Sequence, residues 1–292
     1  MAAPTRFAGI IGLCLIGATQ TLVFAQGTNA PAPSRFMRFV QTTENEGHVD
    51  TAISRYARAD GVSVDLIAAV HIADQQYYKS LNRRFTNYDV VLYEMVKPDD
   101  VAPTPSQHSD NPVSALQNGM KRLLGLEFQL DAIDYAATNF VHADMSPETF
   151  VQAQAANGES ILGLMLRAIL TEQARQAASP NQPDGLQMIM ALFSKDSDYK
   201  LKFLFAQQLE SMEALLSGID QSPGGKGSVL VSGRNQVAMR VLTEQIQLGK
   251  RKLAIFYGAG HMPDFERRLG ESGFKKSSEE WLTSWDVQKP KR

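Results

Sequence analysis

Two histidines stand in similar short segments far apart in the chain. His71 follows Ala68-Ala69-Val70 and His261 follows Gly258-Ala259-Gly260, and an Asp comes three residues after each His. A run of apolar residues typical of a buried strand precedes both segments. Because ligands of open α/β sheets bind beyond the carboxyl ends of strands, two such His can meet in one crevice. The small residues let the backbone turn tightly there and approach a ligand.

A third candidate is Glu94, near the end of the apolar segment YDVVLYEMV at residues 88–96. A carboxylate in a strand buried on both faces is costly unless it is paired or bound to a cation. Two imidazoles and a carboxylate can bind one divalent ion, whose open coordination position holds an activated water. Mn²⁺, Co²⁺ and Zn²⁺ all suit these ligand types. Alternatively, Glu94 is the general base that deprotonates that water.

Further polar residues accompany this set. Arg234 and Asn235 follow an apolar segment, and they can hold a substrate carboxylate or orient Glu94. A structural ion pair between Glu94 and Arg234 competes with the catalytic interpretation. His142 and Asp144 are weaker candidates, since a structural role before the next helix explains them as well. The two Asp after the motif histidines, Asp74 and Asp264, suit helix N-caps.

The composition excludes several other kinds of protein. The 292 residues include one Cys, so an intrachain disulfide or a multi-Cys zinc site is impossible. The formal net charge of −2 lacks the basic footprint of a nucleic-acid binder. Neither HExxH nor GxSxG occurs, which removes support for standard zincins and serine hydrolases. The five His are therefore the main candidates for metal binding or acid–base chemistry near neutral pH.

The N-terminal residues predict export. Residues 7–25 carry no charge, and Val23-Phe24-Ala25 fits a cleavage site, so residues 1–25 are interpreted as a signal peptide. The alternative is a membrane anchor over residues 7–25, which would be the only membrane contact. Residues 26–34 follow as a flexible leader. The protein is expected in the periplasm or outside the cell.

The elements that must position these residues form two α/β portions. Strands are expected at 35–41, 49–58, 64–70, 88–96, 228–232, 253–257 and 281–287, with helices at 74–85, 236–247 and 264–270. Between the portions, after a linker at 97–112, helices are expected at 115–126, 146–156, 160–178, 186–194 and 199–219. The sequence thus predicts one α/β domain over residues 35–292. Its duplicated βαβ-type core has a mixed or parallel sheet, interrupted by an all-helical insertion at about 113–219.

Four segments resemble the TraB/PrgY/GumN family, which is related to the Tiki proteins: VHIAD at 70–74, VVLYEM at 90–95, SGRNQVAMR at 232–240 and YGAGHMPDFERRL at 257–269. The family pattern has two Gly-x-x-His motifs, an acidic residue after the first and an Arg-Asn region before the second. The second motif matches fully, whereas Ala68 replaces the Gly of the first. The resemblance covers roughly residues 60–96 and 228–287.

This resemblance implies a duplicated α/β core with a helical insertion. Tiki relatives are metal-dependent proteases that act outside the cell. By resemblance, His71, Glu94 and His261 are metal or catalytic residues, supported by Arg234 and Asn235, with Gly258 and Gly260 in the motif backbone. The leading hypothesis is an exported metal-dependent hydrolase, a peptidase in the first instance. One alternative is a non-catalytic protein that binds or sequesters a peptide or small signal. Another is an envelope interaction protein whose helical middle is the functional surface.

Overall fold

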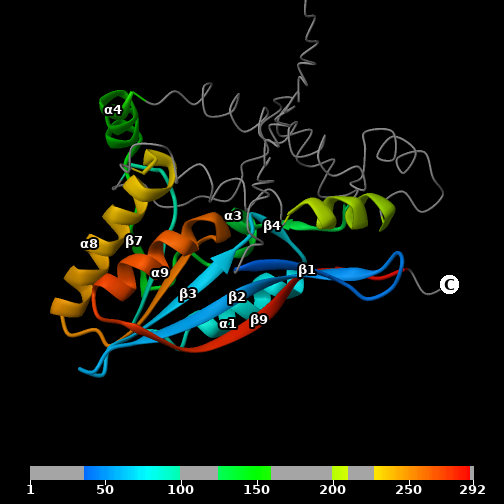
Figure 1. Cartoon of the computed structure of the whole chain (residues 1–292), viewed down its shortest axis with the longest axis horizontal. Coiled ribbons are helices and arrows are strands. Elements are labelled where there is room, and N and C mark those ends of the chain that lie inside the picture. The colour runs from blue at the N-terminus through cyan, green and yellow to red at the C-terminus, as the bar shows by residue number, and fades with distance from the viewer. Residues whose placement is uncertain (1–35, 99–123, 159–198, 210–226, 290–292) are drawn as a thin grey trace, which may run out of the picture.

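The structure is a computed structural model that describes residues 36–98, 124–158, 199–209 and 227–289 (Figure 1). The described elements form a mixed sheet with helices on both faces, so the predicted α/β class is confirmed. Residues 199–209 are helical. The other elements are β1 (Met37–Gln41), β2 (Gly47–Ala57), β3 (Ser63–Ala69), β4 (Ile72–Ala73), α1 (Gln75–Phe85), β5 (Val90–Tyr93), β6 (Glu127–Phe128), α3 (Gln129–Ala132), β7 (Phe140–His142), α4 (Pro147–Asn157), η1 (Val229–Gly233), α8 (Arg234–Gln247), β8 (Lys252–Gly258), η2 (Ala259–His261), α9 (Met262–Glu271) and β9 (Lys275–Val287).

The central strands of the sheet are parallel. The order is β1-β2-β3-β8-β5-β7, with β9 on β2, and the β3–β8, β8–β5 and β5–β7 pairs run in the same direction. β8 lies in the middle, and its residues 253–257 are buried, as expected of a parallel strand covered on both faces. Parallel strands end at one edge, so the ends of β3, β5 and β8 are neighbours.

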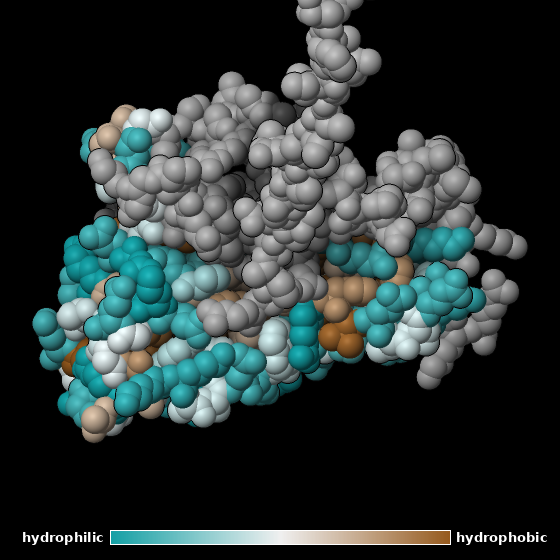
Figure 2. All heavy atoms as spheres, viewed as in Figure 1, coloured by the Kyte–Doolittle hydropathy of each residue, from teal (hydrophilic) through white to brown (hydrophobic). Residues whose placement is uncertain are grey.

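Two adjacent aromatic residues of β8 show how the layers pack. Phe256 contacts Phe85 of α1, with ring centroids 5.0 Å apart, whereas Tyr257 contacts Phe265 of α9 at the same centroid distance. Because successive side chains of a strand point to opposite faces, α1 and α9 cover opposite faces of the sheet. On the face shown in Figure 2, the described residues are mostly hydrophilic, while the large apolar side chains lie between the layers.

The segment before Arg234 differs from the prediction. Residues 228–232 were expected as a strand, but residues 229–233 form the π-helical turn η1, which continues into α8. Val229 and Val231 are buried, and the Ser228 hydroxyl accepts a hydrogen bond from the Leu230 N–H at 3.1 Å. A short segment with three consecutive apolar residues, at 229–231, fits a strand and a buried helical turn equally well. The second α/β portion therefore runs α8–β8–α9–β9 in place of the expected strand–helix–strand–helix–strand.

The described part of the expected insertion at 113–219 is not wholly helical. It contains α4, whose N-cap Ser146 accepts a hydrogen bond from the Thr149 N–H at 3.2 Å. It also supplies β7, which extends the main sheet beside β5, and β6, which pairs with β4. Several expected elements lie outside the described residues: the helices at 160–178 and 186–194, most of that at 115–126, residues 210–219 of that at 199–219, the linker at 97–112 except its first two residues, and residues 1–34.

The final strand closes the segment that carries His71. β9 pairs antiparallel with the whole of β2. Near its end, the Trp285 indole N–H donates to the Ile72 carbonyl at 2.7 Å, and the Asp74 N–H donates to the Ser284 carbonyl at 2.9 Å. Residues from opposite ends of the domain thus fix the backbone after β3. No helix within the described ranges has the length and apolar character needed to cross a bilayer.

Candidate functional site

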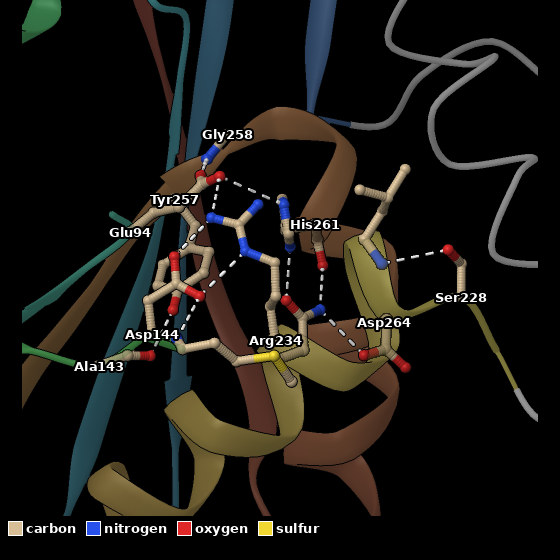
Figure 3. A network of polar contacts seen from close by, with 12 residues as sticks. Glu94, Ala143, Asp144, Ser228, Arg234, Tyr257, Gly258, His261 and Asp264 are labelled. Carbon is tan, nitrogen blue, oxygen red and sulfur yellow. Dashed lines mark hydrogen bonds and ion pairs between the residues drawn. The ribbon is translucent and has the colours of Figure 1, made fainter. Parts of the chain in front are cut away.

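The Glu94 carboxylate lies directly after β5 and reaches the end of β8 (Figure 3). Its Oε2 accepts a hydrogen bond from the Gly258 N–H at 2.7 Å. Its Oε1 lies 2.8 Å from an Arg234 Nη and 3.5 Å from His261 Nε2. The predicted meeting of strand ends is therefore present for Glu94 and His261, and the alternative ion pair with Arg234 is present beside it.

Glu94 stays ionised in this setting. Burial alone would raise the pKa of Glu94, but favourable interactions with His261, Arg234 and His71 outweigh it and hold that pKa well below the usual range. The side chain is 11% exposed. A negative charge is thus kept beside two imidazoles near the surface.

His261 is held from its other side by Asn235. It ends the short 3₁₀ turn η2, its side chain is 9% exposed, and its Nδ1 lies 2.6 Å from Asn235 Oδ1. Asn235 is fully buried in the first turn of α8. The Tyr257 ring packs edge-on against the imidazole, with centroids 5.3 Å apart. The ring is therefore fixed in orientation, with Nε2 toward Glu94.

His71 reaches the same point from the end of β3, although its side chain is exposed. Distances from Gly258 show how close the three side chains lie to one another. A Cβ placed on Gly258 would lie 3.3 Å from Glu94 Oε2 and 3.9 Å from both His71 Nε2 and His261 Cδ2. The three predicted side chains therefore surround one glycine, with His71 at the solvent side.

Gly258 matters at this site because it lacks a side chain, and its backbone angles are ordinary. Gly258 has φ −52°, which any residue can adopt, so its small size is what admits Glu94. Gly260 is buried within η2. Ala68, which replaces the Gly of the first motif, lies in extended β3 opposite Tyr257 and is fully buried. An extended strand backbone does not require glycine, so Ala68 introduces no strain.

Arg234 links Glu94 to a second carboxylate. Its Nε donates to Asp144 Oδ1 at 2.9 Å, and the Asp144 side chain is completely buried. Burial alone would lower the pKa of Arg234, but Asp144 and Glu94 together raise it above its ordinary value. Arg234 is therefore a permanent cation between two carboxylates. Asp144, a weaker candidate in the sequence, belongs to the site through this contact.

The remaining candidates make their contacts outside the group around Gly258. His142 in β7 contacts the Met95 carbonyl through Nε2 at 2.6 Å, and this contact is structural. Asp74 occupies the N-cap position of α1 but makes no capping hydrogen bond with its side chain, which pairs with Lys202 at 2.7 Å. Asp264 is not an N-cap, since it lies inside the first turn of α9. Its carboxylate is drawn inward by Asn235, which donates to Oδ2 at 2.9 Å.

Two residues of the middle region border the site and were missed in the sequence. The Gln129 N–H donates to the His71 carbonyl at 2.9 Å, and Gln129 Nε2 donates to the Tyr135 hydroxyl at 2.9 Å. Burial, with a smaller contribution from the charge of Glu94, raises the pKa of Tyr135 to about 12. Gln129 Oε1 is buried and has no hydrogen-bond partner among the described residues. No spacing or motif connects these residues to His71, so only the fold identifies them.

The donor types at this site suit a divalent metal, but their present arrangement does not. Glu94 Oε1 already contacts the Arg234 cation at 2.8 Å. In the ranges that the structure covers, no group of three or more His, Cys, Asp or Glu side chains forms a ready ligand set. The divalent cofactor therefore stays a prediction.

A cavity of about 520 Å³ lies near this site, on the outer face of α8. Its lining residues on α8, Gln236, Val237 and Arg240, are on the side of the helix away from buried Asn235. Met145 and α4 form the opposite wall. The cavity is therefore separated from Glu94 by the first turn of α8.

Comparisons with known proteins add no relative. No family model, no curated protein and no solved structure matches the chain. The resemblance to the TraB/PrgY/GumN family therefore stays a prediction that rests on the motif residues.

Proposed function

We propose that the chain is a hydrolase of carbonyl compounds, with peptides as the first substrate class, acting where β3, β5 and β8 end. The observation that carries this proposal is the grouping of ionised Glu94, oriented His261 and exposed His71 around Gly258. Three strand ends supply a carboxylate and two imidazoles at one place, which is the combination that general acid–base catalysis uses.

The reaction would begin with a water that donates to His261 Nε2. Nε2 accepts the water proton as the water oxygen forms a bond to the substrate carbonyl carbon. The tetrahedral intermediate then collapses, the C–N bond breaks, and the imidazolium returns the proton to the leaving amine. Glu94 stabilises the imidazolium through its negative charge, since its Oε1 lies 3.5 Å from Nε2. His71, which is exposed to solvent beside Gly258, would contact the substrate.

Arg234 would keep Glu94 ionised and in place rather than react. Its guanidinium is shared between Glu94 and fully buried Asp144, which fixes its position. A cation so placed lowers the pKa of the neighbouring carboxyl. In this proposal Asp144 positions Arg234, and Arg234 in turn positions Glu94 and keeps it ionised.

A non-catalytic binding protein is the second candidate, and one observation favours it. Both oxygens of Glu94 already have partners, the Gly258 N–H on one and Arg234 on the other. A satisfied network of this kind also serves a purely structural purpose. A binder would hold a peptide or small signal near His71 without cleaving it.

The deciding experiment compares cleavage of a peptide library by the wild type with cleavage by Glu94→Gln and His261→Ala. Asp65→Asn is the matched control, because it alters a buried carboxylate paired with Arg55 on another part of the sheet. Loss of turnover in the two site variants and its retention in the control support the hydrolase. Peptides bound without cleavage by the wild type would support the binder.

Metal content is measured on the same proteins after reconstitution with Mn²⁺, Co²⁺ and Zn²⁺ in turn. A stoichiometric ion that is lost in His71→Ala and His261→Ala would support the metal-dependent form of the proposal. Turnover by protein treated with a chelator and free of metal would support the direct form described above.

Export through residues 1–25 also stays a prediction. Expression of the whole chain with sequencing of the mature N-terminus tests it. A mature chain that starts at Gln26 would support cleavage, and a membrane-bound chain that retains residues 7–25 would support the anchor.

A further inference from the structure

We propose that Asp264 is a positioning residue which, through Asn235, fixes the proton of neutral His261 on Nδ1. The nitrogen that faces Glu94, Nε2, then carries the lone pair. The choice of tautomer follows from the contacts alone, whereas its use in hydrolysis rests on the proposed function. Neither the motif pattern nor the spacing of the sequence assigns this role to Asp264.

The amide group of Asn235 has only one consistent orientation. Its Nδ2 donates to the His261 carbonyl at 3.0 Å and to Asp264 Oδ2 at 2.9 Å, while its Oδ1 faces His261 Nδ1 at 2.6 Å. Rotating the amide by half a turn would place Oδ1 against a carbonyl and a carboxylate oxygen, neither of which can donate. Oδ1 must therefore accept from Nδ1, which has to carry a proton.

Asp264 is held firmly enough to impose this orientation. Its side chain is 6% exposed, its Oδ2 accepts from Arg268 Nε at 2.6 Å, and its Oδ1 pairs with Arg267. Arg268 also donates to the Ser232 carbonyl at 3.2 Å, in the turn before α8. The Asp264 carboxylate is thus hydrogen-bonded to residues of both α8 and α9. When it is ionised, it can only accept hydrogen bonds.

A proton on Nδ1 determines the state of the other ring nitrogen of His261, Nε2. With the proton on Nδ1, Nε2 is an acceptor that faces another acceptor, Glu94 Oε1, at 3.5 Å. One water between them would donate one hydrogen to Nε2 and the other to Oε1, which can accept it in addition to its contact with Arg234. This is the water that the hydrolytic step needs, so Asp264 acts on the chemistry without touching the substrate.

The test reads the tautomer of His261 by NMR of protein labelled with ¹⁵N-histidine. The two ring nitrogens have well-separated shifts according to which one is protonated. Spectra are recorded over the pH range in which the His261 signals no longer move, and His261→Gln gives the assignment. The wild type is expected to show Nδ1–H. In Asp264→Leu, a large part of the population is expected to change to Nε2–H, because only the His261 carbonyl then opposes rotation of the Asn235 amide.

Two further variants keep the test decisive. The exchange Asn235→Asp with Asp264→Asn conserves charge and still offers only acceptor oxygens to Nδ1, so Nδ1–H is expected to persist even if Asp264→Leu does not fold. Glu271→Gln is the matched control, since Glu271 pairs with Arg267 on the same helix but is not a partner of Asn235. It is expected to leave the tautomer unchanged.

The outcomes separate this proposal from the proposed function. Nε2–H in the wild type, or undiminished Nδ1–H in a folded Asp264→Leu, would overturn the positioning role. The expected tautomers in a protein that hydrolyses nothing would support the positioning role and count against the hydrolase. Turnover combined with the reversed tautomer would do the opposite.

Discussion

Carboxylates are paired with a single arginine in two regions of this fold, but with different balances of charge. Asp65 of β3 receives two hydrogen bonds from Arg55, both at 2.7 Å, and one from the Tyr88 hydroxyl at 2.6 Å. There one guanidinium meets one carboxylate. At the other region, the single guanidinium of Arg234 is shared by Glu94 and Asp144. This second region has an excess of negative charge.

The surroundings increase this difference. Arg55 is 46% exposed, so its charge is partly solvated, whereas Arg234 is 12% exposed. Among the described residues, the side-chain partners of Asp65 are Arg55 and Tyr88 and include no His, whereas Glu94 Oε1 lies 3.5 Å from His261 Nε2. A balanced pair stabilises the fold and needs nothing more. Two carboxylates that share one guanidinium leave a net negative charge. Where that charge is shielded from water and lies next to imidazoles, it favours the binding of a proton or a cation.

The largest effect is expected from Glu94→Gln, which removes the excess charge but keeps an oxygen for the Gly258 N–H. We expect kcat/KM for a cleaved peptide to fall about 10²–10⁴-fold, the usual contribution of acid–base catalysis. Asp65→Asn should leave kcat/KM of the folded protein unchanged. Equal losses in both variants would mean that the two regions do not differ in the way described.

Asp144→Asn should have the next largest effect, on stability. It weakens the two hydrogen bonds from Arg234 to buried Asp144, while Arg234 keeps its ion pair with Glu94, so we expect a loss of about 1.5–3 kcal/mol in the free energy of unfolding. Asp65→Asn should cost less, about 0.5–1.5 kcal/mol, because Arg55 can turn to water. Urea denaturation of the two variants gives both values, and a larger loss for Asp65→Asn would contradict the contrast.

Gly258→Ala is expected to disturb the site moderately. The added Cβ would lie 3.3 Å from Glu94 Oε2, so the carboxylate must shift by a few tenths of an ångström. Crowding of this kind costs about 1–3 kcal/mol. The control is Gly270→Ala in α9, where a Cβ meets nothing within 4 Å. There the change should be neutral or stabilise by up to about 1 kcal/mol. Thermal unfolding of both variants distinguishes crowding from a general effect of alanine.

The smallest effect is a dependence on pH. The folded pKa of Glu94 is lowered from 4.5, so its ionised form contributes stability that is fully present above that value. The contribution is lost as the pH falls toward the folded pKa, by at most about 1.4 kcal/mol per pH unit. The difference in unfolding free energy between wild type and Glu94→Gln should therefore be constant above pH 4.5 and shrink below it. If the difference already begins to shrink above pH 4.5 as the pH is lowered, that result would contradict the lowered pKa of Glu94.

Much of the fold could be predicted because its signals are local. The apolar run at 253–257 and the helical spacing of Tyr78, Leu81 and Phe85 identify β8 and α1 correctly. The π turn at 229–233 could not be predicted, because its buried valines serve a strand equally well and only packing decides between the two. β7 was missed because three residues make too short a pattern.

The site was predictable where chemistry is concentrated in rare residue types at strand ends. His71, Glu94 and His261 meet as expected because parallel strands end at one edge. Gln129 and Tyr135 reach this edge through a two-stranded pairing of β4 with β6, which leaves no periodic signal. The inward turn of Asp264 depends on Asn235, 29 residues earlier, so its sequence position alone indicates a helix cap.

The pairing of β9 with the segment after β3 has a consequence for the timing of folding during synthesis. The backbone at Ile72 and Asp74 is fixed by Ser284 and Trp285, which the ribosome adds more than 200 residues later. A growing chain can form α1 and β5 early, yet His71 remains without its final support until the last strand has emerged. If the chain is the proposed hydrolase, activity should therefore appear only once β9 has emerged, and a nascent chain arrested before β9 should remain inactive.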